Sequence, residues 1–192
     1  MTSLANPISG VADQARAYTA AILGALGARA EAEVLAETPA ALRQAVAGLT
    51  PAQLATPEAP GKWSIVEVAQ HLADSEVVGA FRYRMILAHD RPAITGYDQD
   101  AWCSRLRYAA SDIEAVLGDF AALRRLNLRL LAATTPAERE RVGVHAERGE
   151  ESAGYLVRLY AGHDLMHLAQ MDRITRSIEQ ARSAASPPAP LR

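Results

Sequence analysis

Long segments with helical spacing of apolar residues, separated by glycine and proline, constrain the fold of this chain of 192 residues most. Apolar side chains recur every three to four residues, whereas the strict apolar–polar alternation of a half-buried strand is nearly absent. A helix with an apolar face must bury that face against other elements. The pattern therefore predicts an all-α protein, most simply a four-helix bundle with an extra N-terminal helix.

Glycine and proline also mark where the expected helices begin and end. Pro39 lies inside the second helical pattern, where its missing N–H predicts a kink or a division into two helices. Ser64 with Glu67, and Ser111 with Glu114, have the spacing of the capping box, so each serine is expected to precede a helix. The expected helices are residues 11–26, 29–46, 64–88, 111–132 and 152–180.

The length suits a single domain with its own core. We expect an N-terminal tail and helix in residues 1–28, the bundle in residues 29–180, and a disordered proline-rich tail in residues 181–192. A net charge of −2 without blocks of like charge argues against nucleic acid or an anionic membrane as partner. No signal-peptide pattern or membrane-spanning apolar run is found, which predicts a cytoplasmic protein. The single cysteine, Cys103, excludes an internal disulfide or a thiolate metal cluster.

Polar and aromatic residues occur where pure helix packing would not require them. Residues 92–108 form a long irregular connection that contains Tyr97 and Trp102. Such a loop in a compact domain more often has a function than not. Arg124 and Asn127 lie on or beside the apolar stripe of the fourth expected helix. Of these residues, Tyr97, Trp102 and Asn127 are candidates for lining a pocket.

Two histidines four residues apart, His163 and His167, lie on one face of the last expected helix. That face also carries large apolar residues, so both imidazoles should point toward the core. Two buried imidazoles without partners would cost ~1–3 kcal/mol each, and a shared metal ion would remove that cost. The spacing is a weak signal by itself, and buried histidines bonded to carbonyl groups would explain it as well.

A third histidine, His71, lies on the expected helix of residues 64–88, on the same side as Glu67, Asp74 and Arg82. This mixture suits the wall of a polar pocket, although a lone half-buried histidine would also fit. A zincin-type protease is set aside, because that motif has a glutamate as general base where this chain has Asp164.

The chain resembles the DinB superfamily, and most closely its YfiT-like branch of metal-dependent hydrolases and bacillithiol transferases. The resemblance covers roughly residues 35–174. Its ordered motifs are Gly48-Leu-Thr-Pro-Ala-Gln-Leu, Pro60 through Glu76, Pro92 through Trp102, His145-Ala-Glu-Arg-Gly149 and His163-Asp-Leu-Met-His-Leu-Ala-Gln170.

The resemblance implies a bundle with up-down-down-up connectivity, in which a long crossover, residues 92–108, joins the second and third helices. It implies a divalent metal bound by His71, His163 and His167, with His89 and His145 not among the ligands. It also implies a homodimer, which the apolar circumference of the helix at residues 64–88 would allow.

Three neutral imidazoles leave a divalent ion with open coordination positions, which is typical of a catalytic site. Zn, Ni or Fe(II) would suit these ligands. The leading hypothesis is a transferase that joins a low-molecular-weight thiol to an electrophile, with the thiol activated by the metal. The alternatives are a metal-dependent hydrolase, and a non-catalytic bundle that binds a metal or ligand in a stress response. Candidates for orienting a ligand histidine are Glu67, Asp74 and Asp164, and candidates for lining the pocket are Arg82, Tyr97, Trp102 and Asn127.

Overall fold

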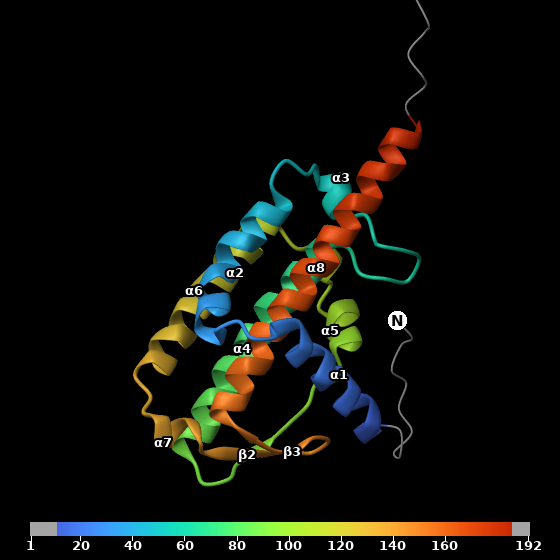
Figure 1. Cartoon of the computed structure of the whole chain (residues 1–192). Helices are drawn as coiled ribbons and strands as arrows, with labels where there is room; N and C mark the ends of the chain where they lie inside the picture. The colour runs from blue at the N-terminus through green and yellow to red at the C-terminus, as the bar shows by residue number, and fades with distance from the viewer. Residues whose placement is uncertain (1–10, 186–192) are drawn as a thin grey trace, which may run out of the picture.

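Four long helices form the body of the molecule in a computed structural model that describes residues 11–185. They are α2 (Glu31–Val46), α4 (Ile65–Ala88), α6 (Ile113–Ala132) and α8 (Ala153–Ala185). In Figure 1, α2 and α8 run in one direction along the bundle, and α4 and α6 run in the other. This is the predicted up-down-down-up four-helix bundle. Among residues 11–185, no helix is long and apolar enough to cross a membrane.

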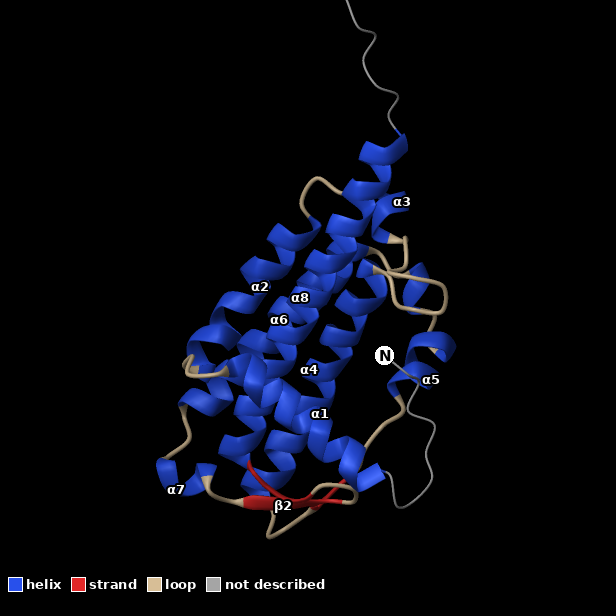
Figure 2. Cartoon of the chain, turned by 45° about the vertical axis from the view of Figure 1, so that its right-hand side comes forward, coloured by secondary structure: helices blue, strands red, loops and turns tan. Residues whose placement is uncertain are grey.

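The connections explain this unusual order. A single helical turn, α3 (Pro51–Leu54), lies between α2 and α4. The crossover from α4 to α6 returns the chain to the end where α4 began, so the two helices run in the same direction (Figure 2). We expected this crossover to be irregular, but it contains three short elements. They are β1 (Ala93–Ile94), α5 (Gln99–Arg105) and a 3₁₀ turn, η1 (Tyr108–Ala110).

A small sheet lies across one end of the bundle, where the sequence predicted only helices and loops (Figures 1 and 2). After the short helix α7 (Pro136–Arg139), β2 (Val142–His145) and β3 (Gly149–Ser152) form an antiparallel hairpin. Strand β1 pairs with β2 in parallel, with Ala93 opposite Val144. Strands of two to four residues are too short for a recognisable alternation, which is why the sequence did not indicate them.

Helix α1 (Val11–Leu26) is the predicted extra helix, and it packs against α8. The two helices approach each other closely at Gly162. A Cβ atom there would lie 2.2 Å from the carbonyl oxygen of Ile22. Glycine therefore allows α1 to lie directly on the N-terminal third of α8.

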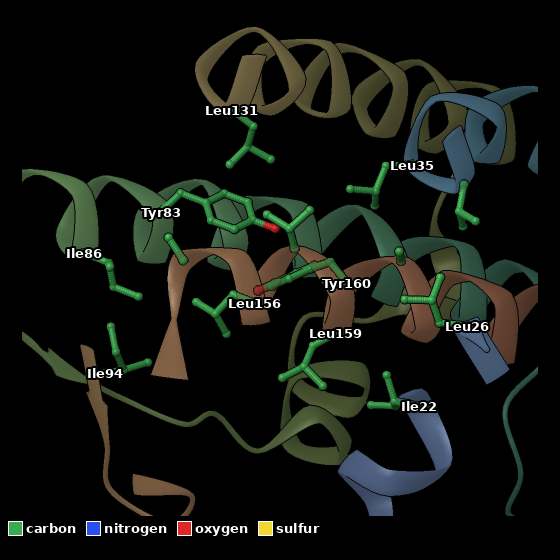
Figure 3. Packing of buried hydrophobic residues seen from close by; sticks show 14 residues of the cluster. Ile22, Leu26, Leu35, Tyr83, Ile86, Ile94, Leu131, Leu156, Leu159 and Tyr160 are labelled. Carbon is green, nitrogen blue, oxygen red and sulfur yellow. The ribbon is translucent and has the colours of Figure 1, made fainter. Parts of the chain in front are cut away.

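The apolar core is divided into two clusters along the bundle. The cluster toward the sheet contains facing tyrosines, Tyr83 and Tyr160, with ring centroids 5.6 Å apart (Figure 3). The second cluster fills the other end. Its largest buried members are Leu42, Ile65, Leu72, Phe120, Met171 and Ile174.

A buried polar layer separates the two clusters. Arg124 is 2% exposed, and it donates to Glu76 at 2.8 Å and to Asp164 at 2.7 Å. Asn127 completes the layer by donating to Glu76 Oε2 at 3.0 Å. One guanidinium between two carboxylates gives each carboxylate a charged partner and leaves a formal charge of −1 in this layer, in which only Asn127 Oδ1 is buried without a hydrogen-bond partner.

The same arginine explains why α2 is a single helix despite Pro39. Proline has no N–H to donate to the carbonyl of Leu35, four residues earlier. Arg124 donates to that carbonyl instead, at 2.9 Å. The predicted division of the helix at Thr38–Pro39 is therefore wrong, because a side chain of α6 replaces the missing hydrogen bond.

Two expected helix boundaries also differ. Helix α6 has its N-cap at Asp112, whose carboxylate accepts from Ala115 N–H at 2.9 Å, rather than at Ser111. Helix α8 continues to Ala185, beyond the expected boundary at residue 180. The rest of the expected disordered tail, residues 186–192, lies outside the described residues, as do residues 1–10.

Candidate metal centre

The three predicted ligands converge in the middle of the bundle. His71 comes from α4, and His163 and His167 come from successive turns of α8. The Nε2 atom of His163 lies 3.1 Å from Nε2 of His71 and 3.1 Å from Nε2 of His167. Two imidazole nitrogens bound to one tetrahedral zinc ion at about 2.0–2.1 Å lie roughly 3.4 Å apart. These two pairs are therefore close to the separation that a shared divalent ion needs, and all three ligand atoms lie within 4.8 Å of one another.

The electrostatics keep the three imidazoles neutral, as metal ligands must be. Burial lowers the pKa of His71 and of His163 well below the ordinary value, and the neighbouring histidines lower both further. Burial also lowers the pKa of His167, although Gln170 and Asp164 oppose this. Neutral rings have one lone pair each to offer to a cation.

The hydrogen bonds of His167 fix which nitrogen faces the cluster. Its Nδ1 lies 2.9 Å from Gln170 Oε1, and an amide oxygen can only accept, so Nδ1 carries the proton. The lone pair on Nε2 then points toward His163. A bonding partner on the far nitrogen is the usual device for orienting a metal-ligating histidine.

The carboxylates expected in that orienting role are engaged elsewhere. Within residues 11–185, no hydrogen bond joins Glu67, Asp74 or Asp164 to one of the three histidines, and Gln170 takes the role for His167. Nδ1 of His71 and Nδ1 of His163 are buried without a hydrogen-bond partner. The partners of the three carboxylates are Ser64 and Cys103 for Glu67, Gln70 and Tyr108 for Asp74, and Thr38 and Arg124 for Asp164.

Trp63 forms an aromatic wall beside the triad. Its ring centroid lies 4.9 Å from that of His71 and 6.4 Å from that of His167, nearly parallel to the latter. Trp63 directly precedes Ser64, the N-cap of α4. The capping box that follows it is present, because Ser64 N–H donates to Glu67 Oε2 at 2.7 Å and fixes the start of α4.

A cavity of about 870 Å³ opens beside His163. Helix α1, the crossover, the turn between β2 and β3, and α8 surround it. Tyr97 lines it and its hydroxyl lies 3.1 Å from Ser75 Oγ. The residues that face this cavity from the different elements include Tyr18, Thr19, Ser75, Arg82, Thr95, Gly96, Tyr97, His145, Glu147, Arg148, Tyr160 and His163.

Of the four pocket candidates, Arg82 and Tyr97 line this cavity. Trp102 lies behind Tyr97, with ring centroids 4.5 Å apart, and supports that wall. Asn127 lies instead in the buried polar layer, where it bonds Glu76. A polar residue on a core stripe can serve a buried ion pair as well as a pocket, and sequence spacing does not distinguish the two.

Several cavity residues were not expected from the sequence. Tyr18 and Thr19 of α1 line the cavity, although the sequence indicated no functional role for the N-terminal helix. His145 and Arg148 belong to a segment that only the family resemblance singled out. Their position depends on how α1 and the sheet pack on the bundle, which no local pattern encodes.

Comparison with known proteins places this chain in a family. The chain is 34% identical over 151 residues to "Putative metal-dependent hydrolase YfiT" of Bacillus subtilis, covering 75% of this chain and 82% of YfiT. A Geobacillus thermodenitrificans protein named "Putative metal-dependent hydrolase" is 33% identical over 136 residues, covering 70% of this chain and 76% of its own length.

The fold agrees with these sequence matches. The solved structure of Bacillus subtilis YfiT, described as a probable metal-dependent hydrolase with an unusual four-helix bundle topology, superposes with a TM-score of 0.74. It is 26% identical and covers 93% of this chain and 94% of its own. The sequence model of the DinB superfamily matches residues 35–171, which confirms the predicted resemblance. The chain therefore belongs to the DinB superfamily.

Proposed function

We propose that the protein is a metal-dependent enzyme in which His71, His163 and His167 hold a divalent Zn, Ni or Fe(II) ion. The observation that carries this proposal is the convergence of three neutral imidazole nitrogens beside a cavity. When bound, the ion would lower the pKa of a thiol or water molecule and so supply a nucleophile near neutral pH.

The residues around the triad support a reaction on the cavity side. His163 lines the cavity, so a small molecule there can approach the triad. Trp63 does not line the cavity and covers a different part of the triad. The open coordination positions would then face the substrate rather than the apolar core.

Thiol transfer is the leading reaction and hydrolysis is the alternative. An attacking water commonly needs a general base, as the glutamate of the zincins illustrates. The three carboxylates expected beside the ligands, Glu67, Asp74 and Asp164, are bonded to other groups. A thiol has an ordinary pKa of about 8.5 and needs no such base. The names of the relatives favour hydrolysis, so both reactions are tested together.

The first experiment is elemental analysis of protein purified without a histidine tag, followed by assays of thiol consumption with electrophiles and a panel of hydrolysable esters and amides. About one metal ion per chain is expected, falling to near zero in His71→Ala and unchanged in the control His89→Ala, whose histidine is exposed. Metal with thiol consumption supports the transferase. Metal with ester or amide turnover alone supports the hydrolase.

A non-catalytic bundle makes a different prediction. In that case the metal would be structural, and His71→Ala would lower the melting temperature sharply while no substrate is turned over. A wild-type protein without bound metal, and without affinity for added Zn, Ni or Fe(II), would refute the proposed function.

A further inference from the structure

Arg82 is a buried cation without a carboxylate partner. It is 8% exposed, and it donates through Nη2 to the carbonyl oxygen of Thr95 at 2.8 Å. Its Nε is buried and has no hydrogen-bond partner. In the part of the chain that the structure describes, no Asp or Glu lies within ion-pair distance of Arg82. A buried charge in this state is costly unless something pairs with it.

The two other arginines buried or half-buried nearby show the contrast. Arg124 is held between Glu76 and Asp164. Arg148 also lines the cavity, but it donates to both carboxylate oxygens of Glu151, at 2.5 and 2.9 Å. Asp98, Asp100 and Glu147 also line the cavity, but within residues 11–185 none of them lies within ion-pair distance of Arg82, whose charge therefore has no direct carboxylate partner.

His145 adds an unpartnered donor to the same cavity. The backbone N–H of Glu147 donates to its Nδ1 at 3.2 Å, so the neutral ring carries its proton on Nε2. That Nε2 is buried and without a hydrogen-bond partner. Burial and the charge of Arg148 lower the pKa of His145 to about 4, which keeps the ring neutral. A buried N–H donor without an acceptor is rare in folded proteins.

Both side chains line the cavity that reaches His163. We propose that Arg82 and His145 form a binding subsite for a carboxylate group of the small-molecule substrate. A carboxylate would supply the negatively charged partner that Arg82 does not have within the protein. Its oxygens would accept hydrogen bonds from the unpartnered N–H groups of both side chains. The subsite rests on the proposed function only in that its ligand is the substrate that also approaches the triad.

The test compares two probes that differ only in this group, 3-mercaptopropionate and its neutral amide, 3-mercaptopropanamide. Binding to metal-free protein is measured by ligand-observed NMR, so the result does not depend on activity. Wild-type protein is expected to prefer the carboxylate by roughly tenfold or more, as a charge-assisted hydrogen bond implies. Equal binding of the two probes would overturn the subsite, and so would tighter binding of inorganic phosphate than of the carboxylate.

Matched variants locate the effect. Arg82→Met should reduce the ratio of the affinities for the carboxylate and the amide to about one. Arg82→Lys, which keeps the charge, should retain part of the preference for the carboxylate. His145→Phe should weaken it severalfold. The control is Arg84→Met, because Arg84 lies two residues away on α4 but is exposed and donates to the carbonyl of Ala80. A preference that persists in Arg82→Met would overturn the proposal.

The outcome is separable from that of the proposed function. If metal-free protein prefers the carboxylate but metal-loaded protein consumes neither thiol nor ester, the subsite stands and the enzymatic proposal falls. If metal-loaded protein is active and the two probes bind equally, the enzyme stands and the subsite falls. Circular dichroism and melting temperatures show that each variant is folded before it is scored.

Discussion

Replacing Arg124 by methionine should destabilise the metal-free protein far more than any surface change. The guanidinium lies between the Glu76 and Asp164 carboxylates, at 2.8 and 2.7 Å, and all three side chains are at most 3% exposed. Methionine fills a similar volume but removes the charge. Two carboxylates would then be left facing each other in the interior.

The size of the effect follows from these contacts. Breaking a buried ion pair by removing one partner costs about 3–5 kcal/mol, because the remaining charge is buried and uncompensated. The Leu35 carbonyl, which lacks a helical donor because of Pro39, would lose its only replacement among the described residues. An orphaned buried acceptor costs about 1–3 kcal/mol, although the two costs do not add fully. The free energy of unfolding of a whole domain is only about 5–15 kcal/mol, so the variant should be near the limit of folding.

Urea denaturation followed by circular dichroism, in the presence of a chelator, measures the free energy of unfolding without a metal contribution. The matched control is Arg125→Met, because Arg125 is the exposed neighbour on α6. Adding Glu76→Gln to Arg124→Met should restore part of the loss, since one uncompensated charge is then removed. If the free energy of unfolding of Arg124→Met fell by less than about 1 kcal/mol, and by no more than that of Arg125→Met, the buried layer would not stabilise the fold as argued.

Two other substitutions test how the cavity is built. The folded pKa of His145, about 4, lies below the ordinary 6.5, so the unfolded chain binds more protons at this residue between these values. His145 alone should therefore contribute a loss of up to about 3 kcal/mol in the free energy of unfolding as the pH falls from 6.5 to 4, in addition to the contributions of the three histidines of the triad. His145→Phe should show a smaller loss in urea titrations across that window; equal slopes would contradict the assignment. Gly162→Ala should lower the free energy of unfolding by about 1–3 kcal/mol, because its methyl group meets the Ile22 carbonyl oxygen at 2.2 Å. Gly118→Ala, where the added atom meets nothing within 4 Å, is the control in thermal melts, and an equal Tm for the two variants would contradict this packing.

The long helices could be predicted from the sequence because their spacing repeats over many turns. Helix α4 also carries its own start signal in Ser64 and Glu67, which the structure contains. The short strands could not be predicted, since two to four residues give no period. The continuity of α2 at Pro39 could not be predicted either, because Arg124 from α6 supplies the missing donor.

The site divides in the same way. His163 and His167 are paired by local helical spacing, but His71 lies on another helix, and only the family resemblance joined it to them. The spacing of carboxylates around the ligands suggested Glu67, Asp74 and Asp164 as orienting groups, and the structure gives that position at His167 to Gln170. Which polar group reaches a histidine depends on side-chain geometry after packing, and sequence distance alone does not determine it.

Charge is distributed unequally around the candidate site, and this distribution favours ligand groups of opposite charge at the triad and at the cavity wall. The buried layer that contains Asp164 has a formal charge of −1, and Asp164 favours positive charge at His167, although Arg124 of the same layer opposes it at His163. On the cavity wall, Arg82 has a buried Nε without a hydrogen-bond partner, which favours an anion beside it. A substrate carboxylate bound at Arg82 would not compete for the metal, so the other end of the substrate would be the part that meets the triad. The charged side chains would thus determine the orientation of the substrate before any chemistry occurs.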